Sequence, residues 1–449
     1  MIVFLGILIL VAVVWVWLLI SPTFQLSLKY ALNADTAFPS PGAGQCSWPT
    51  VTVVIPARNE ADTLPTTIPT ICGQDYPDLR VVLVDDQSDD GSSEVIAQLQ
   101  SAHPNLTVVQ GTSRPAGWHG KQWAVKQGVD RAKTDHDSLN LDGMECPSSR
   151  IESGCPQPGS DHYLLFTDAD IIFHPQVVRQ TILAMQARKL EMLSLLPQLI
   201  LGSASERLAL AGAMALISAL FPLSRANNPK SRLALAAGGF ILIRRDVYER
   251  VGGHASVKSE MIEDLGLARV LKSAGVRMQT LFTCDLLHTR MYNGLADLWE
   301  GLSKNAFAGL NYSLWKYFAG AIGGSIIGIL PPVYLALSLV LTAQNPSSLT
   351  WAALALSLLI NLCMIVVHSR VARHLRLPLW HSTLLPVTGV FYNLIVAWSV
   401  YQHYFTAGTV WKGRQYRNDS TASSNDLPTA PAAPARSDPA VATDRYPGR

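Results

Sequence analysis

The chain begins with an unbroken apolar run from Ile2 to Ile20. A helix of this length crosses the roughly 30 Å hydrocarbon core of a bilayer. A cleaved signal peptide is the alternative, but such a peptide needs a basic start and a small-residue cleavage site, and the run has neither. The first basic residue, Lys29, lies on the C-terminal side, so the positive-inside rule places the following chain in the cytoplasm. We therefore expect an uncleaved membrane anchor over residues 1–21.

More apolar segments lie near the C-terminus, within residues 318–406. They are Phe318–Leu341, Trp351–Val367 and Leu384–Phe405, each of spanning or near-spanning length. Basic stretches at 368–381 and 411–417 flank the last segment, and both cannot be cytoplasmic if that segment crosses once. We expect a multi-pass protein of the cell (inner) membrane, with the domain between the first and the later apolar segments in the cytoplasm. The last segment either crosses the bilayer or follows a re-entrant or interfacial path.

The charge content agrees with a chain that lies partly in lipid. Only 15% of the residues are charged, whereas soluble domains carry about a quarter. The formal net charge is +2, and this near balance gives no reason to expect a nucleic-acid partner. The 6 cysteines form no CxxC pair, so neither a disulfide scaffold nor a zinc site is expected, and a reducing compartment is favoured.

The middle of the chain, residues 48–290, alternates between strand-like and helix-like segments. VTVVIPA and LRVVLVDD are short β-branched runs that end in polar residues, as buried parallel strands do, and LTVVQG and HYLLFTDAD are similar. Helix-compatible stretches separate them, which predicts an α/β domain with an open, mostly parallel, Rossmann-like sheet. Ligands of such sheets bind at the carboxyl ends of the strands.

Composition divides the rest of the chain into further segments. Residues 134–161 are polar and rich in Pro, Gly and Ser, which predicts a surface insertion, and 206–225 predict an interfacial or buried helix. We expect an amphipathic linker at 291–317 and a basic WKGRQYR motif at 407–417. The tail at 418–449 is rich in Ser, Ala, Pro, Thr and Asp, so we expect it to be disordered.

Acidic residues end two of the predicted strands, at Asp85-Asp86 and at Asp168-Ala169-Asp170. Residues two apart share one side of an extended chain, so Asp168 and Asp170 are placed to hold one cation. Such a pair suits Mg²⁺ or Mn²⁺, which keep waters, bridge to substrate phosphates and neutralise the charge of a leaving diphosphate. A DxD pattern alone is also a common chance match or helix cap, so this prediction depends on the other motifs.

Five motifs occur in order between residues 50 and 290, and together they resemble family 2 glycosyltransferases of the GT-A fold. They are VVIPARNE (53–60), VDDQSDDG (84–91), TDAD (167–170), GGFILIRRDVYERVGG (238–253) and MIEDLGLARVLKSAGVRM (261–278). The resemblance implies that the first two contact the nucleotide and the third binds the metal. It implies that the fourth lies beside the acceptor and that the fifth carries a catalytic Asp.

Within that family the chain most resembles the bacterial hopene-associated membrane glycosyltransferases, and more distantly the ceramide glucosyltransferases. The first group combines an N-terminal anchor and this catalytic block with text like WEGLSKNAFAGL and WKGRxY, both of which occur here. The resemblance implies a lipid acceptor, for which a hopanoid is one candidate.

The resemblance also assigns roles to single residues. Asp264 is expected to be the general base that deprotonates the acceptor hydroxyl, and the alternative is an acid that stabilises the helix dipole. The expected donor-binding residues are Pro56, Ala57, Arg58, Glu60, Asp85, Asp86, Lys121, Asp168 and Arg414. The expected acceptor-side residues are Gly238, Gly239, His254, Glu263 and Trp411, and the expected metal ligands are Asp168 and Asp170. For Trp411 and Arg414 an interfacial aromatic and basic anchor is an equal alternative.

These assignments predict a metal-dependent, inverting glycosyltransferase. It would move a hexose or N-acetylhexosamine from a nucleotide-diphosphate sugar, expected to be a UDP-sugar, to the hydroxyl of a membrane lipid. One alternative is a polyprenyl-phosphate glycosyltransferase, whose anionic nucleophile needs no base. Another is a processive polysaccharide synthase, which the missing QxxRW motif disfavours. The last is an inactive membrane scaffold with a transferase-like fold.

Overall fold

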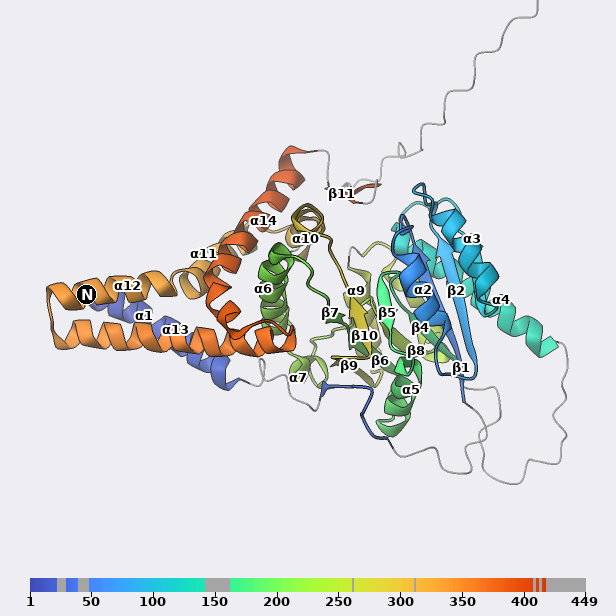
Figure 1. Ribbon diagram of the computed structural model, residues 1–449, viewed down its shortest axis with the longest axis horizontal. Coiled ribbons are helices and arrows are strands. Elements are labelled where there is room, and N and C mark those ends of the chain that lie inside the picture. The colour runs from blue at the N-terminus through green and yellow to red at the C-terminus, as the bar shows by residue number, and fades with distance from the viewer. Residues whose placement is uncertain are drawn as a thin grey trace, which may run out of the picture. The chain divides into compact units, whose positions relative to one another are not determined.

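A computed structural model describes residues 1–21, 30–38, 48–141, 162–260, 262–310, 312–406, 409–411 and 414–416 (Figure 1). The central sheet has strand order β3-β2-β1-β4-β8-β6-β9. The strands are β1 Thr50–Ala57, β2 Leu79–Asp85, β3 Leu106–Gln110, β4 His162–Phe166, β6 Met192–Leu196, β8 Ile241–Arg244 and β9 Met278–Phe282. All neighbouring pairs run parallel except those of β8, which is antiparallel to β4 and β6. This mostly parallel sheet confirms the predicted α/β class.

Helices cover both faces of this sheet, which explains why its strands are continuously apolar. Val53 and Ile55 of β1 face one buried cluster and Val54 faces another, because successive side chains of a strand point to opposite faces. The helices on the first face are α2 Leu64–Cys72, α3 Ser92–Ala102 and α5 Val177–Ala187. Those on the second are α4 Gly120–Leu141, α8 Arg245–Arg250 and α9 Glu263–Ser273, together with the 3-10 turn Gly253–Val257.

A second, smaller sheet joins the acidic triad to the helices that follow the α/β region. Its order is β5-β10-β7, and its strands are β5 Ile171–Phe173, β10 Leu287–Thr289 and β7 Gln198–Leu199. Strand β5 follows Asp170 directly and pairs antiparallel with β10, so Thr289 lies opposite Ile171. A short hairpin, β11 Thr409–Trp411 with β12 Arg414–Tyr416, lies against helix α10 (Leu295–Gly309).

Helix α4 corrects one sequence-based boundary. Residues 134–141 were predicted as the start of a non-periodic insertion, yet they continue α4 to Leu141. This segment, TDHDSLNL, contains neither Gly nor Pro, so nothing in it ends a helix. The rest of the predicted insertion, 142–161, and the tail at 418–449 lie outside the described residues.

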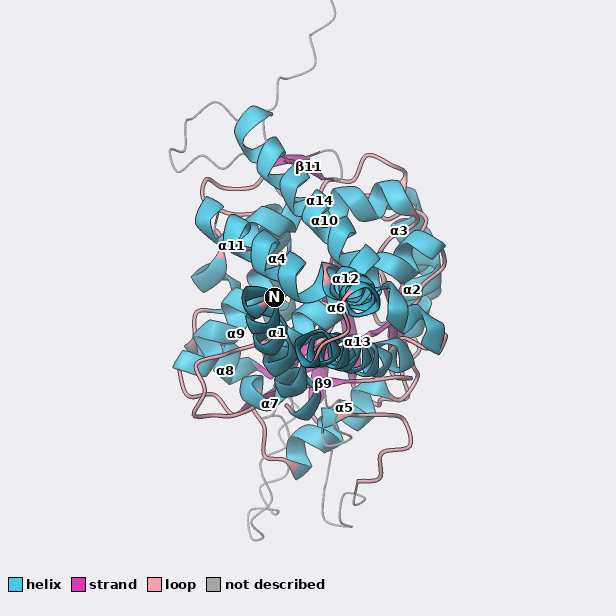
Figure 2. Cartoon of the chain, turned by 90° about the vertical axis from the view of Figure 1, so that its left-hand side faces the viewer, coloured by secondary structure: helices cyan, strands magenta, loops and turns pink. Residues whose placement is uncertain are grey.

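The remaining helices are mostly apolar. They are α1 Ile2–Ile20, α6 Ala204–Leu220, α7 Leu223–Ala226, α11 Leu314–Gly324, a π-helical turn Ser325–Ile329, α12 Pro331–Gln344, α13 Ser348–His374, a 3-10 turn Leu379–Leu384 and α14 Leu385–Phe405. Among the residues that the structure describes, 3 helices are long and apolar enough to cross a membrane: α1, α13, and the 3-10 turn with α14. Helices α11 and α12 meet at a bend of 52° and would make a fourth crossing if they form one span. Figure 2 looks along α1, α12 and α13, which pack together.

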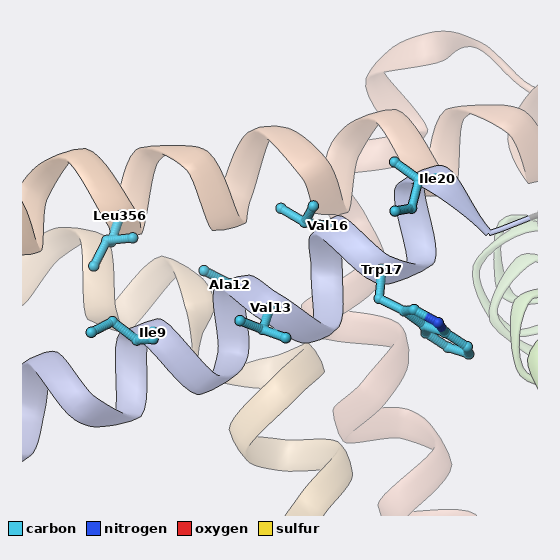
Figure 3. A pocket seen from close by; sticks show the side chains of 7 residues that line it. All are labelled: Ile9, Ala12, Val13, Val16, Trp17, Ile20 and Leu356. Atoms are coloured by element: carbon cyan, nitrogen blue, oxygen red, sulfur yellow. The ribbon is translucent and has the colours of Figure 1, made fainter.

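Helix α1 packs lengthwise against α13, and its outer face is apolar. The two helices border a shallow groove of about 370 Å³ (Figure 3). Its lining residues are Ile9, Ala12, Val13, Val16, Trp17, Ile20 and Leu356. Trp17 is 57% exposed there. An apolar surface of this kind is stable where it meets lipid rather than water.

The bend between α11 and α12 arises where the backbone loses a helical hydrogen bond, and side chains supply donors to the carbonyl groups there. Pro331 has no N–H, so the carbonyl of Ile327 loses its regular helical donor. The indole Nε1 of Trp15, in α1, donates to that carbonyl oxygen at 2.9 Å. The carbonyl of Ile326 likewise accepts from the Tyr334 hydroxyl at 3.2 Å. In an apolar layer such replacements are required, because no water can satisfy the freed groups.

Replacing Trp15 with Phe should lower the stability of the protein in detergent by about 1–3 kcal/mol, because the Ile327 carbonyl would stay buried and unpaired. Thermal unfolding of the full chain measures the effect. Trp17→Phe, in the same helix but on its exposed face, is the control and should unfold near the wild-type temperature. Equal unfolding temperatures for the two variants would contradict a role for the Trp15 hydrogen bond.

Candidate functional site

Two loops at the carboxyl ends of β1 and β2 are joined by hydrogen bonds. The Asn59 side chain donates to Asp89 Oδ1 at 2.8 Å and accepts from the Asp89 N–H at 3.1 Å. The Glu60 N–H donates to Ser92 Oγ at 2.9 Å. These bonds fix the polar loops at the sheet edge where α/β folds bind ligands.

The predicted donor-binding residues of these strands lie together at this edge. Pro56 and Ala57 end β1, and Arg58 Nη1 donates to the carbonyl oxygen of Asp86 at 2.6 Å. The buried Asp85 carboxylate accepts from the Ser88 N–H at 3.0 Å, and from a serine hydroxyl of α3 at 2.7 Å. Arg58 and Asp85 therefore shape the loop, and Asp85 keeps lone pairs for a further donor.

An acidic centre forms where β4, α4 and α9 meet. Lys121, in the first turn of α4, lies between two carboxylates. Its Nζ is 2.6 Å from Asp168 Oδ1 and 2.5 Å from Glu263 Oε1. Asp264 Oδ2 accepts from the Gly238 N–H at 2.9 Å. A lysine predicted on the donor side and a glutamate predicted on the acceptor side are thus joined in one network.

Gly238 is the point on which these groups converge. A Cβ at this position would lie 3.1 Å from Lys121 Nζ, 3.3 Å from Asp168 Oδ2 and 3.6 Å from Asp264 Oδ2. Any other residue would place its side chain in the space that these three groups face. The glycine therefore leaves room for a ligand between Asp168 and Asp264.

The electrostatics of the centre are those of crowded carboxylates. Burial, with the charge of Glu263, raises the pKa of Asp264 to about 7, although Lys121 opposes the shift. Burial alone would raise the pKa of Glu263, but the contact with Lys121 lowers it. Burial likewise works against the Lys121 ammonium, whereas Asp168 and Glu263 raise its pKa well above the usual value. Lys121 is therefore charged, Glu263 is ionised, and Asp264 titrates near neutral pH.

Asp170 lies beside this centre and is held by the second sheet. Its Oδ2 accepts from the Thr289 hydroxyl at 3.0 Å. Burial, then the charge of Asp168, raises the pKa of Asp170 to about 6. Thr289 was not among the sequence-predicted residues, because only the pairing of β5 with β10 brings it to Asp170.

The residues fit a divalent cation that is shared with a substrate. Asp168, Glu263 and Asp264 lie around Lys121, and Asp170 lies near Asp168, so these carboxylates outnumber the one ammonium among them. Within the described part of the chain, no group of 3 or more His, Cys, Asp or Glu side chains is placed to hold a metal ion by itself, so a cation here would need ligands from the substrate or water. Mg²⁺ and Mn²⁺ suit such a place, because they bind through one or two carboxylates and complete their shell with phosphates and water.

The acceptor-side predictions fall in two kinds of surroundings. The Gly239 carbonyl accepts from the Thr167 hydroxyl at 2.9 Å, which ties the β8 approach to the acidic triad. His254 is only 4% exposed, lies 4.8 Å from the Phe166 ring, and has Nδ1 2.9 Å from the Tyr248 hydroxyl. This burial favours a packing role for His254 over the predicted acceptor contact. For Trp411 and Arg414 the structure describes only backbone, and their side chains lie outside the described part.

Glu206 is a buried carboxylate that sequence analysis missed, although Ser203 three residues earlier has the spacing of a capping box. It accepts from the N–H groups of Gly202 at 2.7 Å and Gly294 at 2.9 Å, and from Arg290 Nη2 at 3.2 Å. Burial would raise its pKa, but these bonds hold the pKa of Glu206 at about 2. The loops that follow β7 and β10 are therefore joined at one carboxylate.

Replacing Glu206 with Ala should lower the free energy of unfolding by about 3–5 kcal/mol, because Arg290 and two N–H groups would lose a buried acceptor. The wild-type contribution is complete above pH 4.5 and is lost as the pH falls toward about 2, because folding lowers this pKa. Denaturant unfolding measures the loss. Glu249→Ala removes two more exposed ion pairs, with Arg245 and Lys133, and should cost at most about 1–2 kcal/mol. Similar losses in both variants would contradict this role of Glu206.

Comparison with known proteins places the site in context. Residues 49–294 match the protein family described as "Glycosyltransferase like family 2". The chain is 25% identical over 374 residues to the 4,4'-diaponeurosporenoate glycosyltransferase of Staphylococcus aureus (strain USA300), covering 82% of this chain and 88% of that protein. The same enzyme of strain bovine RF122 / ET3-1 is 24% identical over the same shares.

Solved structures give weaker likenesses. The mannosyltransferase PcManGT from Pyrobaculum calidifontis, in complex with GDP-Man and Mn²⁺, has a TM-score of 0.48 and 16% identity, covering 87% of this chain and 99% of that one. S. aureus TarS 1-349 in complex with UDP-GlcNAc has a TM-score of 0.35 and 14% identity, covering 83% of this chain and 97% of that one.

Proposed function

Because this chain belongs to glycosyltransferase family 2, and is therefore a glycosyltransferase, we propose that it is an inverting, metal-dependent enzyme. Its donor is a nucleotide-diphosphate sugar, for which UDP is the expected nucleotide, and its acceptor is a membrane lipid. The observation that carries the proposal is the convergence of Asp168, Lys121 and Asp264 over Gly238. The space between them brings a donor-binding carboxylate and a candidate base to one point.

The donor is proposed to lie along the carboxyl ends of β1, β2 and β4. The loops of Arg58 and Asp85 would hold the nucleoside, and Asp168 and Asp170 would hold Mg²⁺ or Mn²⁺ beside the diphosphate. When bound, the cation supplies positive charge that offsets the charge on the leaving diphosphate. Lys121 supports the same role, because its ammonium already lies 2.6 Å from Asp168.

Asp264 is proposed to be the general base. The acceptor oxygen would attack the anomeric carbon from the face opposite the diphosphate, and the bond from that carbon to the diphosphate oxygen would break. The hydroxyl proton would pass to Asp264, and one displacement of this kind inverts the anomeric centre. Two features support the role: a pKa of about 7 suits a base at neutral pH, and the Gly238 N–H fixes the carboxylate.

The acceptor is proposed to reach the site from the membrane, with the catalytic domain on the cytoplasmic side. The helices long enough to cross a bilayer support this, and so does the relative, whose printed name gives a carotenoid acid as its substrate. A hopanoid remains a candidate among hydroxyl lipids. A carboxylate or polyprenyl-phosphate acceptor is the second possibility, and it differs in needing no base.

A deletion strain and the purified full chain together test the proposal. Mass spectrometry of wild-type lipid extracts should show one lipid class that carries an added hexose or N-acetylhexosamine. In extracts of the deletion strain the same lipid should be present without that sugar. The purified protein should hydrolyse or transfer from a UDP-sugar only when Mg²⁺ or Mn²⁺ is present. An unchanged lipid profile together with no nucleotide-sugar turnover would favour an inactive scaffold instead.

A further inference from the structure

Two tyrosines connect the acidic centre with the apolar helices. Tyr292 follows β10 and is buried in the cluster that also contains residues of α1, α6 and α13, and Tyr392 of α14 packs against the same cluster. Burial, then the charges of Asp297 and Asp170, raises the pKa of Tyr292 to about 12. The two tyrosines are thus linked through one apolar cluster, which extends from the loop after β10 to a helix long enough to cross a membrane.

Glycines allow the close packing around these tyrosines. A Cβ at Gly301 of α10 would collide with the Tyr292 ring, and one at Gly212 of α6 would collide with the side chain of Thr388 in α14. The hydroxyl of Thr388, one turn before Tyr392, donates to a backbone carbonyl of α6 at 3.1 Å. Helices α6, α10 and α14 are therefore closely packed around the two tyrosines.

The hydroxyl of Tyr392 is buried, and within the described residues it has no hydrogen-bond partner. A buried phenol hydroxyl without a partner destabilises the folded state, so a ligand that accepts or donates a hydrogen bond there would remove that penalty. Resting on the proposed function, we propose that Tyr392 and Tyr292 bind the polar head of the lipid acceptor as it passes between α6, α10 and α14 toward Asp170.

The surroundings select the chemistry of that head. The charge of the nearby Asp297 disfavours an anion beside Tyr292. Arg290, two residues before Tyr292, is paired with Glu206 at 3.2 Å. The phenols and the apolar walls suit an uncharged hydroxyl, which donates and accepts hydrogen bonds without carrying charge into the cluster. The acceptor class is therefore a neutral, hydroxyl-headed lipid rather than a carboxylate or a phosphate.

Three probes with one tail test the head selectivity: farnesol, farnesoic acid and farnesyl phosphate, each added to the full chain in detergent micelles. Farnesol should bind the wild type at least about fivefold more tightly than the two anions, as measured by ligand-induced shifts of the unfolding temperature. Tyr392→Phe should weaken farnesol binding about five- to tenfold, which corresponds to the loss of one hydrogen bond. Equal binding of the three probes would overturn the proposal, and so would unchanged farnesol binding by Tyr392→Phe.

Two controls separate this site from a structural role and from the donor site. Without probe, Tyr392→Phe should unfold at or above the wild-type temperature, because it removes an unpaired hydroxyl, whereas loss of a structural hydrogen bond would lower it. Tyr401→Phe, on the same helix but 47% exposed, should bind farnesol like the wild type. Metal-dependent hydrolysis of UDP-glucose or UDP-GlcNAc should be equal in all three proteins. If none of the three proteins hydrolyses the UDP-sugars while the wild type still prefers farnesol, the result would count against the proposed function and not against this binding site.

Discussion

Replacing Asp264 with Asn should lower the turnover number for transfer to a hydroxyl acceptor by about 10²–10⁴-fold, the usual contribution of a general base. Asn is nearly the same size and can still accept from the Gly238 N–H, so the backbone of the site should be preserved. The affinity for the nucleotide sugar should change little, because the donor is held by the loops of β1 and β2 and by Asp168. Turnover and donor affinity are measured separately on the purified full chain.

The pH dependence gives a second readout of the same residue. A base must be ionised, so kcat/KM of the wild type should rise with pH up to about 7 and level off above it, following the pKa of Asp264. The kcat/KM of Asp264→Asn should not show this rise toward pH 7. Unchanged turnover in this variant would exclude a general base at this position and would favour an acceptor that is already anionic.

Removing a metal ligand should have the other large effect. Asp170→Asn should lower the turnover of the donor about a thousandfold, because a neutral amide is a poor ligand for a hard cation. This factor corresponds to several kcal/mol of lost transition-state stabilisation. The turnover of both proteins is measured against Mn²⁺ concentration, and the variant should need far more Mn²⁺ or fail to saturate.

Thr289→Val provides the graded comparison. It removes only the hydroxyl that donates to Asp170 at 3.0 Å, so the loss should be about 10–100-fold, as for groups that orient metal ligands. Full turnover in the presence of a chelator, or an Asp170→Asn variant with the Mn²⁺ response of the wild type, would contradict a metal at this pair.

The parts of the fold that sequence predicted are those coded by local pattern. Continuous β-branched runs identified β1, β2, β3 and β4, and the match to the family over residues 49–294 confirms the predicted enzyme class. The acids at the strand ends followed from the same patterns. Lys121 was predicted on the donor side, but its contact with Glu263, and that of Thr289 with Asp170, did not follow from these patterns, because each depends on which distant segments pack together. Lys121 meets Glu263 across 142 positions of chain only because α4 and α9 cover the same face of the sheet.

One feature could have been predicted from the sequence but was not. The Pro331-Pro332 pair removes two helical donors and predicts the break that separates α11 from α12. The indole that donates to the freed Ile327 carbonyl comes from α1, and no local pattern identifies it. The antiparallel placement of β8 between β4 and β6 is likewise a property of the folded sheet alone.

The bond between Trp15 and Ile327 also sets an order of assembly during synthesis. Its two residues are 312 positions apart. At roughly 5–20 residues per second, the ribosome needs tens of seconds to make the second after the first. The whole α/β domain therefore emerges between the first helix and the helices that it packs against, and this helix bundle can close only after that domain has been made. A chain that stalls before α11 would leave its first helix without those packing partners.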